Sequence, residues 1–153
     1  MSTARRSTDV TSKHVDGQLD KLKQSISDMQ ASIADAKKET HQQVRARIDN
    51  AATKMQSAAA EVERKAEASS AEAKSQWSAF KGNLEAKRDE VSHRIASREN
   101  EHDIKRSERA ANAAEADAVD AINFAELAVH NACLSVLDAI DARLYADELA
   151  GAN

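Results

Sequence analysis

Large apolar residues recur along most of the chain at the spacing of an α-helix. From Val15 to Ile95 they form one continuous stripe, once the polar positions Thr40, Ser69 and Arg88 fill its gaps. The mean step is about 3.64 residues, which is the helical period without a phase error. The pattern therefore predicts one long amphipathic helix whose single apolar face runs along its whole length.

The first part of this helix has a heptad pattern, because its apolar steps alternate between four and three residues. We expect residues 12–57 to extend as a coiled-coil arm. Before the arm, residues 1–11 are rich in Ser, Thr and Arg, and we expect them to form a disordered, mobile tail. The core positions predicted for the arm are Val15, Leu19, Leu22, Ile26, Met29 and Ile33.

From Val44 onward the stripe follows an 11-residue period through Met55, Ala66 and Trp77, and it also includes Ala51, Val62 and Phe80. Such a period suits a nearly straight helix. It resembles the period of exchangeable apolipoproteins, of synuclein-like lipid binders and of the late-embryogenesis class of desiccation-protection proteins. The resemblance covers residues 44–95 and concerns the period, without a shared consensus. It implies a helix that coats a surface or acts as a stress protectant.

The apolar face changes direction before the last helix. Ile95 and Ile104 are nine residues apart, which rotates the face by about 180° on a straight helix. A turn near 97–103, with Asn100 as a candidate cap of the next helix, would let both faces meet. We therefore predict an all-α fold in which residues 58–153 form a helical hairpin with an antiparallel C-terminal helix.

The C-terminal helix, which we expect to stop at Gly151, carries a wide apolar arc. One antiparallel neighbour covers only part of such an arc. The remainder would leave a large apolar patch on a monomer, so we predict a homo-oligomer, in the simplest case a dimer. The predicted interface comprises Ile122, Leu127, Val129, Leu134, Val136, Leu137, Ile140, Leu144 and Tyr145.

The composition excludes several classes of protein. The chain has 32 Ala, three Gly and no Pro, and 3% of its residues are aromatic. Sheets need more β-branched and aromatic residues and more turn residues, which argues against β-sandwiches, barrels and Rossmann-type enzymes. Long thin helices also leave no deep pocket for a small molecule.

Charge and hydropathy bear on partners and location. Residues 1–110 hold 21 basic and 18 acidic side chains, whereas residues 111–153 hold one basic and eight acidic side chains. Because the basic residues alternate with acidic ones, nucleic acid is not an expected partner. Neither a secretory signal nor a run of 18 uncharged apolar residues is apparent, and we expect a cytoplasmic protein.

Candidate chemistry is sparse. Glu99 and His102 match one half of a di-iron helix-bundle motif whose second half is missing. Glu126 and His130 are four residues apart, which favours a pair on the solvent side over a metal site. Cys133 lies among apolar residues, and we expect it to be a small buried hydrophobe. These patterns predict no enzyme, no metal site and no cofactor.

Three function hypotheses follow. The first is a non-catalytic helical interaction or scaffold protein that self-associates through its C-terminal hairpin and binds an unidentified protein partner. The alternative is an amphipathic coat on a lipid or polymer surface, as in apolipoproteins or the phasins of storage granules. The second alternative is a helical stress protectant that folds on drying.

Overall fold

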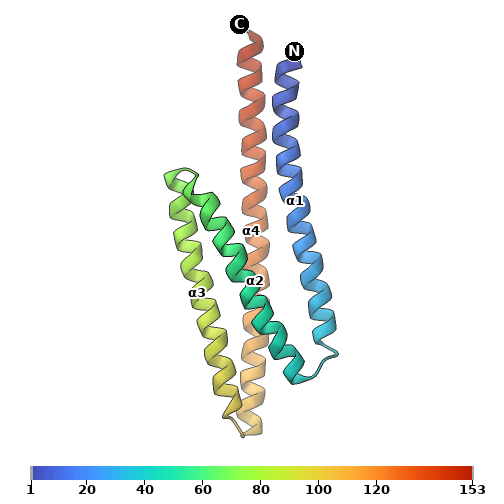
Figure 1. Cartoon of the computed structure of the whole chain (residues 1–153), viewed down its shortest axis with the longest axis vertical. Coiled ribbons are helices and arrows are strands. Elements are labelled where there is room, and N and C mark those ends of the chain that lie inside the picture. The colour runs from blue at the N-terminus through green and yellow to red at the C-terminus, as the bar shows by residue number, and fades with distance from the viewer. Residues whose placement is uncertain (1, 153) are drawn as a thin grey trace. The chain divides into compact units, whose positions relative to one another are not determined.

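A computed structural model describes the backbone of residues 2–152 and the side chains of residues 13–151 (Figure 1). The described residues form four α-helices, with no strand among them: α1 (Ser2–Ala36), α2 (His41–Glu67), α3 (Ala71–Glu99) and α4 (Ile104–Ala152). The prediction of an all-α fold is confirmed. Contacts within the chain define two units, one of residues 32–110 and one of residues 1–31 with 111–153.

The prediction of one unbroken helix from residue 15 to residue 95 is wrong, because the chain leaves the helix at residues 37–40 and 68–70. Each break is fixed by a hydroxyl cap. Thr40 and Gln43 form a capping box that begins α2, and the Ser70 hydroxyl accepts a 3.2 Å hydrogen bond from the Ala73 N–H at the start of α3. The first break also divides the stretch predicted as the arm.

The helix is interrupted inside the stretch 97–103 where we predict a turn, since α3 ends at Glu99 and α4 begins at Ile104. The expected role of Asn100 is wrong. Asn100 caps the C-terminus of α3, whereas Asp103 begins α4 by accepting a 3.0 Å hydrogen bond from the Arg106 N–H. A carboxylate is the stronger acceptor for the free N–H groups of a first helical turn.

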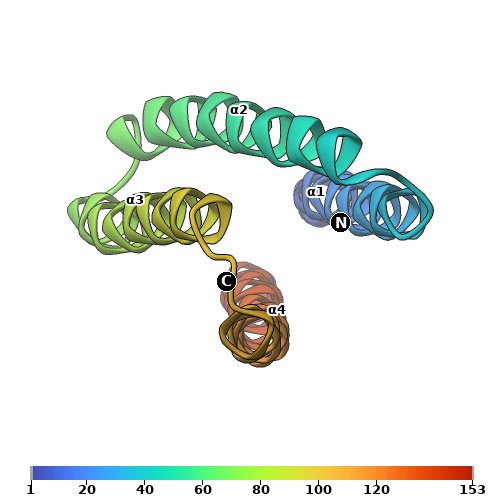
Figure 2. The same ribbon diagram turned by 90° about the horizontal axis from the view of Figure 1, so that it is seen from below.

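Inside the unit of residues 32–110, α2 and α3 lie side by side and run antiparallel, joined by residues 68–70 (Figures 1 and 2). We call these two helices the α2–α3 pair. The predicted hairpin of residues 58–153, in which α4 is the second helix, stays a prediction.

The two ends of the chain differ from expectation in one respect. α4 continues through Gly151 to Ala152, so Gly151 does not stop the helix in a left-handed conformation. At the other end, Met1 lies outside the described residues, and the backbone of α1 begins at Ser2. The mobility of residues 1–11 stays a prediction.

Candidate interaction surfaces

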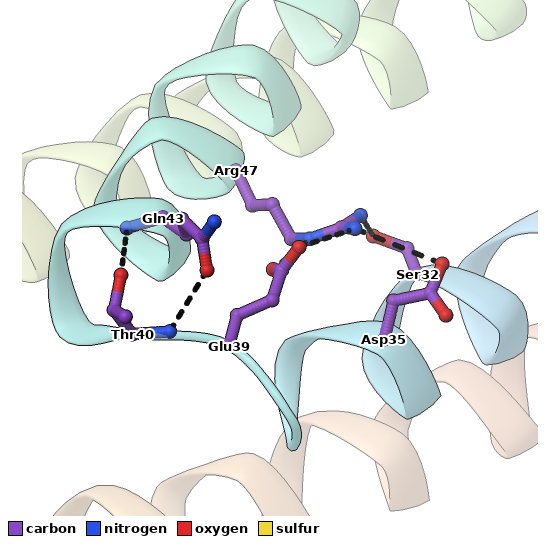
Figure 3. A network of polar contacts seen from close by, with 6 residues as sticks. All are labelled: Ser32, Asp35, Glu39, Thr40, Gln43 and Arg47. Carbon is purple, nitrogen blue, oxygen red and sulfur yellow. Dashed lines mark hydrogen bonds and ion pairs between the residues drawn. The ribbon is translucent and has the colours of Figure 1, made fainter.

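Arg47 holds together the corner between α1 and α2 (Figure 3). Its guanidinium contacts Glu39 through two nitrogens, one at 2.9 Å, donates to the Ser32 hydroxyl at 3.1 Å and lies 3.7 Å from Asp35. The hydrogen bond from Arg47 lowers the pKa of Glu39, and the same bond raises the pKa of Arg47. One arginine therefore links the last turn of α1, the connecting loop and the first turns of α2.

Three polar contacts cross the α2–α3 pair at one constant register. Arg45 contacts Glu99, Gln56 with its amide oxygen toward Arg88 accepts at 3.0 Å, and Glu63 accepts from Lys81 at 2.9 Å. From the first contact to the second, α2 advances 11 residues while α3 goes back 11. From the second to the third, both steps are seven residues. The first spacing equals the 11-residue period of the sequence, and the second is two helical turns.

The face that α2 and α3 present to each other is half-buried and differs by one residue from the predicted stripe at three places. Ala52, Glu63 and Lys81 are half-buried, where the stripe predicted Ala51, Val62 and Phe80. At two of the three places the contact of Glu63 with Lys81 accompanies the shift, because it draws two charged residues into the interface. The half-buried residues of this face include Val44, Ile48, Ala52, Met55, Ala59, Glu63, Ala66, Ala73, Trp77, Lys81, Leu84, Val91 and Ile95.

Trp77 is half-buried in α3 beside the Glu63 contact, and its indole nitrogen is buried. Its ring centroid lies 6.0 Å from that of Phe80 at an interplanar angle of 49°, a tilted aromatic pair. The hydrogen bond from Lys81, its charge and, to a smaller extent, the Trp77 indole lower the pKa of Glu63. Glu63 correspondingly raises the pKa of Lys81.

A shallow groove of about 220 Å³ runs along the α2–α3 pair. Its apolar lining includes Met55 and Leu84. Its polar groups already contact one another, since Glu63 accepts from Lys81 and Gln56 accepts from Arg88. The groove is therefore a seam between two helices, and these two contacts cross it.

The residues predicted for the oligomer interface all lie on α4, in the unit of residues 1–31 and 111–153. Val136 is half-buried and the other eight are exposed, from 45% for Val129 to 69% for Leu134. At 100° per residue they form two rows about 130° apart, with Leu137 between them. The first row is Ile122, Val129, Val136, Ile140 and Leu144, and the second is Leu127, Leu134 and Tyr145. We call these nine residues the α4 face.

The residues predicted for the arm all lie on α1. Val15 is half-buried, and the other five are 40–51% exposed: Leu19, Leu22, Ile26, Met29 and Ile33. Their coiled-coil pairing with a partner helix stays a prediction.

The side chains singled out for possible chemistry lie along α4, at the end of α3 and in the connection between these helices. Glu126 and His130 are both exposed and 3.8 Å apart, so the solvent-side pair is confirmed. Cys133 is exposed in the single chain, contrary to the expected buried hydrophobe. The apolar residues around it in sequence project from α4 as it does and cannot cover it. Among the described residues, no group of three or more His, Cys, Asp or Glu side chains is placed to hold a metal ion.

Sequence reasoning missed the residues that organise the corner and the turn. The pattern Thr40-x-x-Gln43 is the sequence signal of a capping box, and it is readable without a structure. The long-range ion pairs of Arg45 with Glu99 and of Lys81 with Glu63 have no such local signal. These pairs can be identified only when the break at 68–70 is known.

The chain matches no protein-family model, no curated protein and no solved structure. None of the helices in the described part of the chain has both the length and the apolar character needed to cross a membrane.

Proposed function

We propose that the protein is a non-catalytic helical interaction or scaffold protein that self-associates through the α4 face. The observation that carries the proposal is the exposure of this face, where Leu127, Leu134 and Ile122 are each more than 60% exposed. Burying a large aliphatic side chain stabilises by roughly 1.5–3 kcal/mol. Eight such side chains and a tyrosine therefore favour association over exposure to water.

A second copy of the chain fits this face better than a lipid surface does. Residues 111–153 hold one basic and eight acidic side chains. Anionic membrane surfaces attract basic residues and repel such an acidic helix. A second copy has the same two rows of apolar side chains, so each copy can cover the other. We place this self-association in the cytoplasm, where Cys133 stays reduced.

The test replaces Leu127 and Leu134 with Asp in the full chain. At low protein concentration we expect monomers with nearly unchanged helix content, because the aspartates remove apolar contacts of the α4 face while the α4 backbone stays helical. Sedimentation equilibrium measures the assembly, and circular dichroism measures the helix content.

The matched control is Ala128→Asp with Ser135→Asp. It adds the same two charges to exposed positions with the same seven-residue spacing, on the side of α4 away from the two rows. The control should stay assembled. A Leu127/Leu134 variant that remains assembled, or a control that dissociates equally, would contradict the proposal. If the wild type becomes helical only with vesicles, the coat on a lipid surface is the correct function.

A further inference from the structure

The contacts across the α2–α3 pair are arranged symmetrically about one residue. Position 72 is the midpoint in sequence of all three: Arg45 with Glu99, Gln56 with Arg88, and Glu63 with Lys81. This position is in the first turn of α3, directly after the connection between the helices. The contacts of the pair would therefore keep their register under a twofold rotation centred on it.

The connection itself is close to a helix in composition and conformation. Ala68 has φ −84° and ψ −1°, which lies near the helical region, and Ser70 is extended with φ −66° and ψ 161°. No described residue has a positive φ, and the connection contains neither Gly nor Pro. Ala68 is near helical torsions and Ser70 is far from them in ψ, so continuing α2 into α3 requires above all a rotation about the ψ of Ser70.

The buried faces of the two helices stay in phase across this connection. Ala66 at the end of α2 and Ala73 at the start of α3 are both half-buried and seven residues apart, which is two helical turns. A hairpin does not need this spacing, because its connection can orient each helix independently. A single continuous helix does need it, since only then do both halves present one face.

We propose that two copies of this chain exchange α3, so that residues 41–99 become one helix and pair with the same segment of a second copy in the antiparallel direction. Each contact of the closed pair then forms between chains: Arg45 with Glu99 of the second copy, and Glu63 with its Lys81. Exchange of an identical element is a low-cost route to a dimer, because the contacts of the monomer are reused.

The small side chains of Ser69, Ser70 and Ala73 suit the centre of this dimer. In the antiparallel arrangement the two copies of this segment cross at the twofold axis, where short side chains allow two helices to approach closely. The exchange uses the α2–α3 interface and does not involve the α4 face. It can therefore be tested with α4 association already removed.

The experiment measures the distance inside one chain between spin labels at Ala58→Cys and Ala86→Cys. Both positions are exposed and symmetric about position 72, and Cys133→Ala removes the native thiol. The background also carries Leu127→Asp and Leu134→Asp, and labelled chains are diluted into unlabelled ones. The closed pair holds the labels within roughly 25 Å, as neighbouring helices do. The open helix separates them by about 42 Å.

Two variants of the connection move the equilibrium in opposite directions. Ser70→Ala removes the cap of α3 and favours the open helix by on the order of fivefold per chain. Ala71→Pro is compatible with the extended Ser70 before it and with the first position of α3. In the open helix the same proline lies mid-helix and disfavours that form by on the order of 100-fold per chain.

We expect the population with the long distance to grow with protein concentration in the wild type, to grow further in the Ser70→Ala variant and to be lost in the Ala71→Pro variant. If the wild type and the Ser70→Ala variant keep only the short distance through the whole concentration series, the exchange does not occur. A long distance that persists equally in the Ala71→Pro variant would show local unfolding instead and would also overturn the proposal.

Discussion

The α2–α3 pair and α4 have the same period but carry different side chains on it. In the α2–α3 pair, residues 11 apart include Ala52 and Glu63, which both lie in the half-buried face. Glu63 also forms an ion pair with Lys81 across the two helices. In α4, residues 11 apart include Ile122, Cys133 and Leu144, all exposed. The period sets the straightness of a helix, whereas the size and charge of the side chains decide what covers its face.

From this difference we propose separate roles for the two regions. Alanines allow α2 and α3 to approach each other, and the pairs Arg45 with Glu99 and Glu63 with Lys81 fix their register within a chain. The large aliphatic side chains of α4 remain exposed and can gain more from association. We expect the stability of the folded chain to depend on the α2–α3 pair, and assembly at low protein concentration to depend on the α4 face.

The largest expected change in stability comes from Trp77→Ala. Truncating a buried tryptophan costs roughly 3–5 kcal/mol, so the half-buried Trp77 should cost about 2 kcal/mol. Urea unfolding followed by circular dichroism measures the cost. The control is Phe80→Ala. The Phe80 side chain is 55% exposed, so its truncation should lower the free energy of unfolding by less. A greater loss for Phe80→Ala, or dissociation of the assembly by Trp77→Ala, would break the proposed division of roles.

A smaller effect is expected from Thr40→Ala, which removes the capping box at the start of α2. Loss of a threonine cap costs about 1 kcal/mol, because the Gln43 N–H in the first turn loses its acceptor. Thr53→Ala is the matched control, since Thr53 lies inside α2 and only donates back to the Asp49 carbonyl. Equal urea midpoints for the two variants would show that the cap does not stabilise the break at 37–40.

How far the sequence predicts this fold depends on the kind of signal. The apolar period correctly predicts helix over most of residues 15–95, and the reversal of the apolar face between Ile95 and Ile104 correctly predicts the third break. The apolar period does not predict the first two breaks, because Thr40 and Ser69 occupy stripe positions and the helical phase continues across them. Caps, not periodicity, contain that information.

The surfaces are predictable to different degrees. The α4 face could be identified from its side chains alone, and its residues are on one helix as expected. The shift from Val62 to Glu63 in the α2–α3 pair could not be predicted, because it depends on the position of Lys81 across the interface. Apolar periodicity alone cannot predict that an ion pair such as Glu63 with Lys81 lies in the interface between two helices.

A third, smaller effect concerns pH. The pKa of Glu63 is lowered in the folded chain, so the unfolded chain binds more protons as pH falls below the ordinary glutamate value of 4.5. The contact with Lys81 therefore stabilises fully above that pH, and this stabilisation is lost as pH falls through the lowered pKa. The raised pKa of Lys81 has the opposite consequence: its contribution is complete below 10.5 and is lost as pH rises through the raised value.

The measurement compares urea midpoints of the wild type and Glu63→Gln across this range, with the emission of Trp77 as the probe. Trp77 is the only tryptophan of the chain and lies beside Glu63. We expect the difference between the two proteins to be largest between pH 5 and 10. It should be small throughout, because water and salt screen the half-exposed pair. A difference that grows below pH 4 would show the sign to be wrong.

The smallest effect on assembly is expected from Leu22→Asp with Ile26→Asp in α1. The arm has six large residues over about three heptads, near the lower limit for a stable coiled coil, and the break at 37–40 prevents its continuation into α2. Leu22 and Ile26 are each 40% exposed, against 64% and 69% for Leu127 and Leu134. Sedimentation equilibrium should therefore show an intact oligomer for the α1 variant under conditions where Leu127→Asp with Leu134→Asp gives monomers. If the α1 variant dissociates while the α4 variant remains assembled, the association surface is the arm on α1 and not the α4 face.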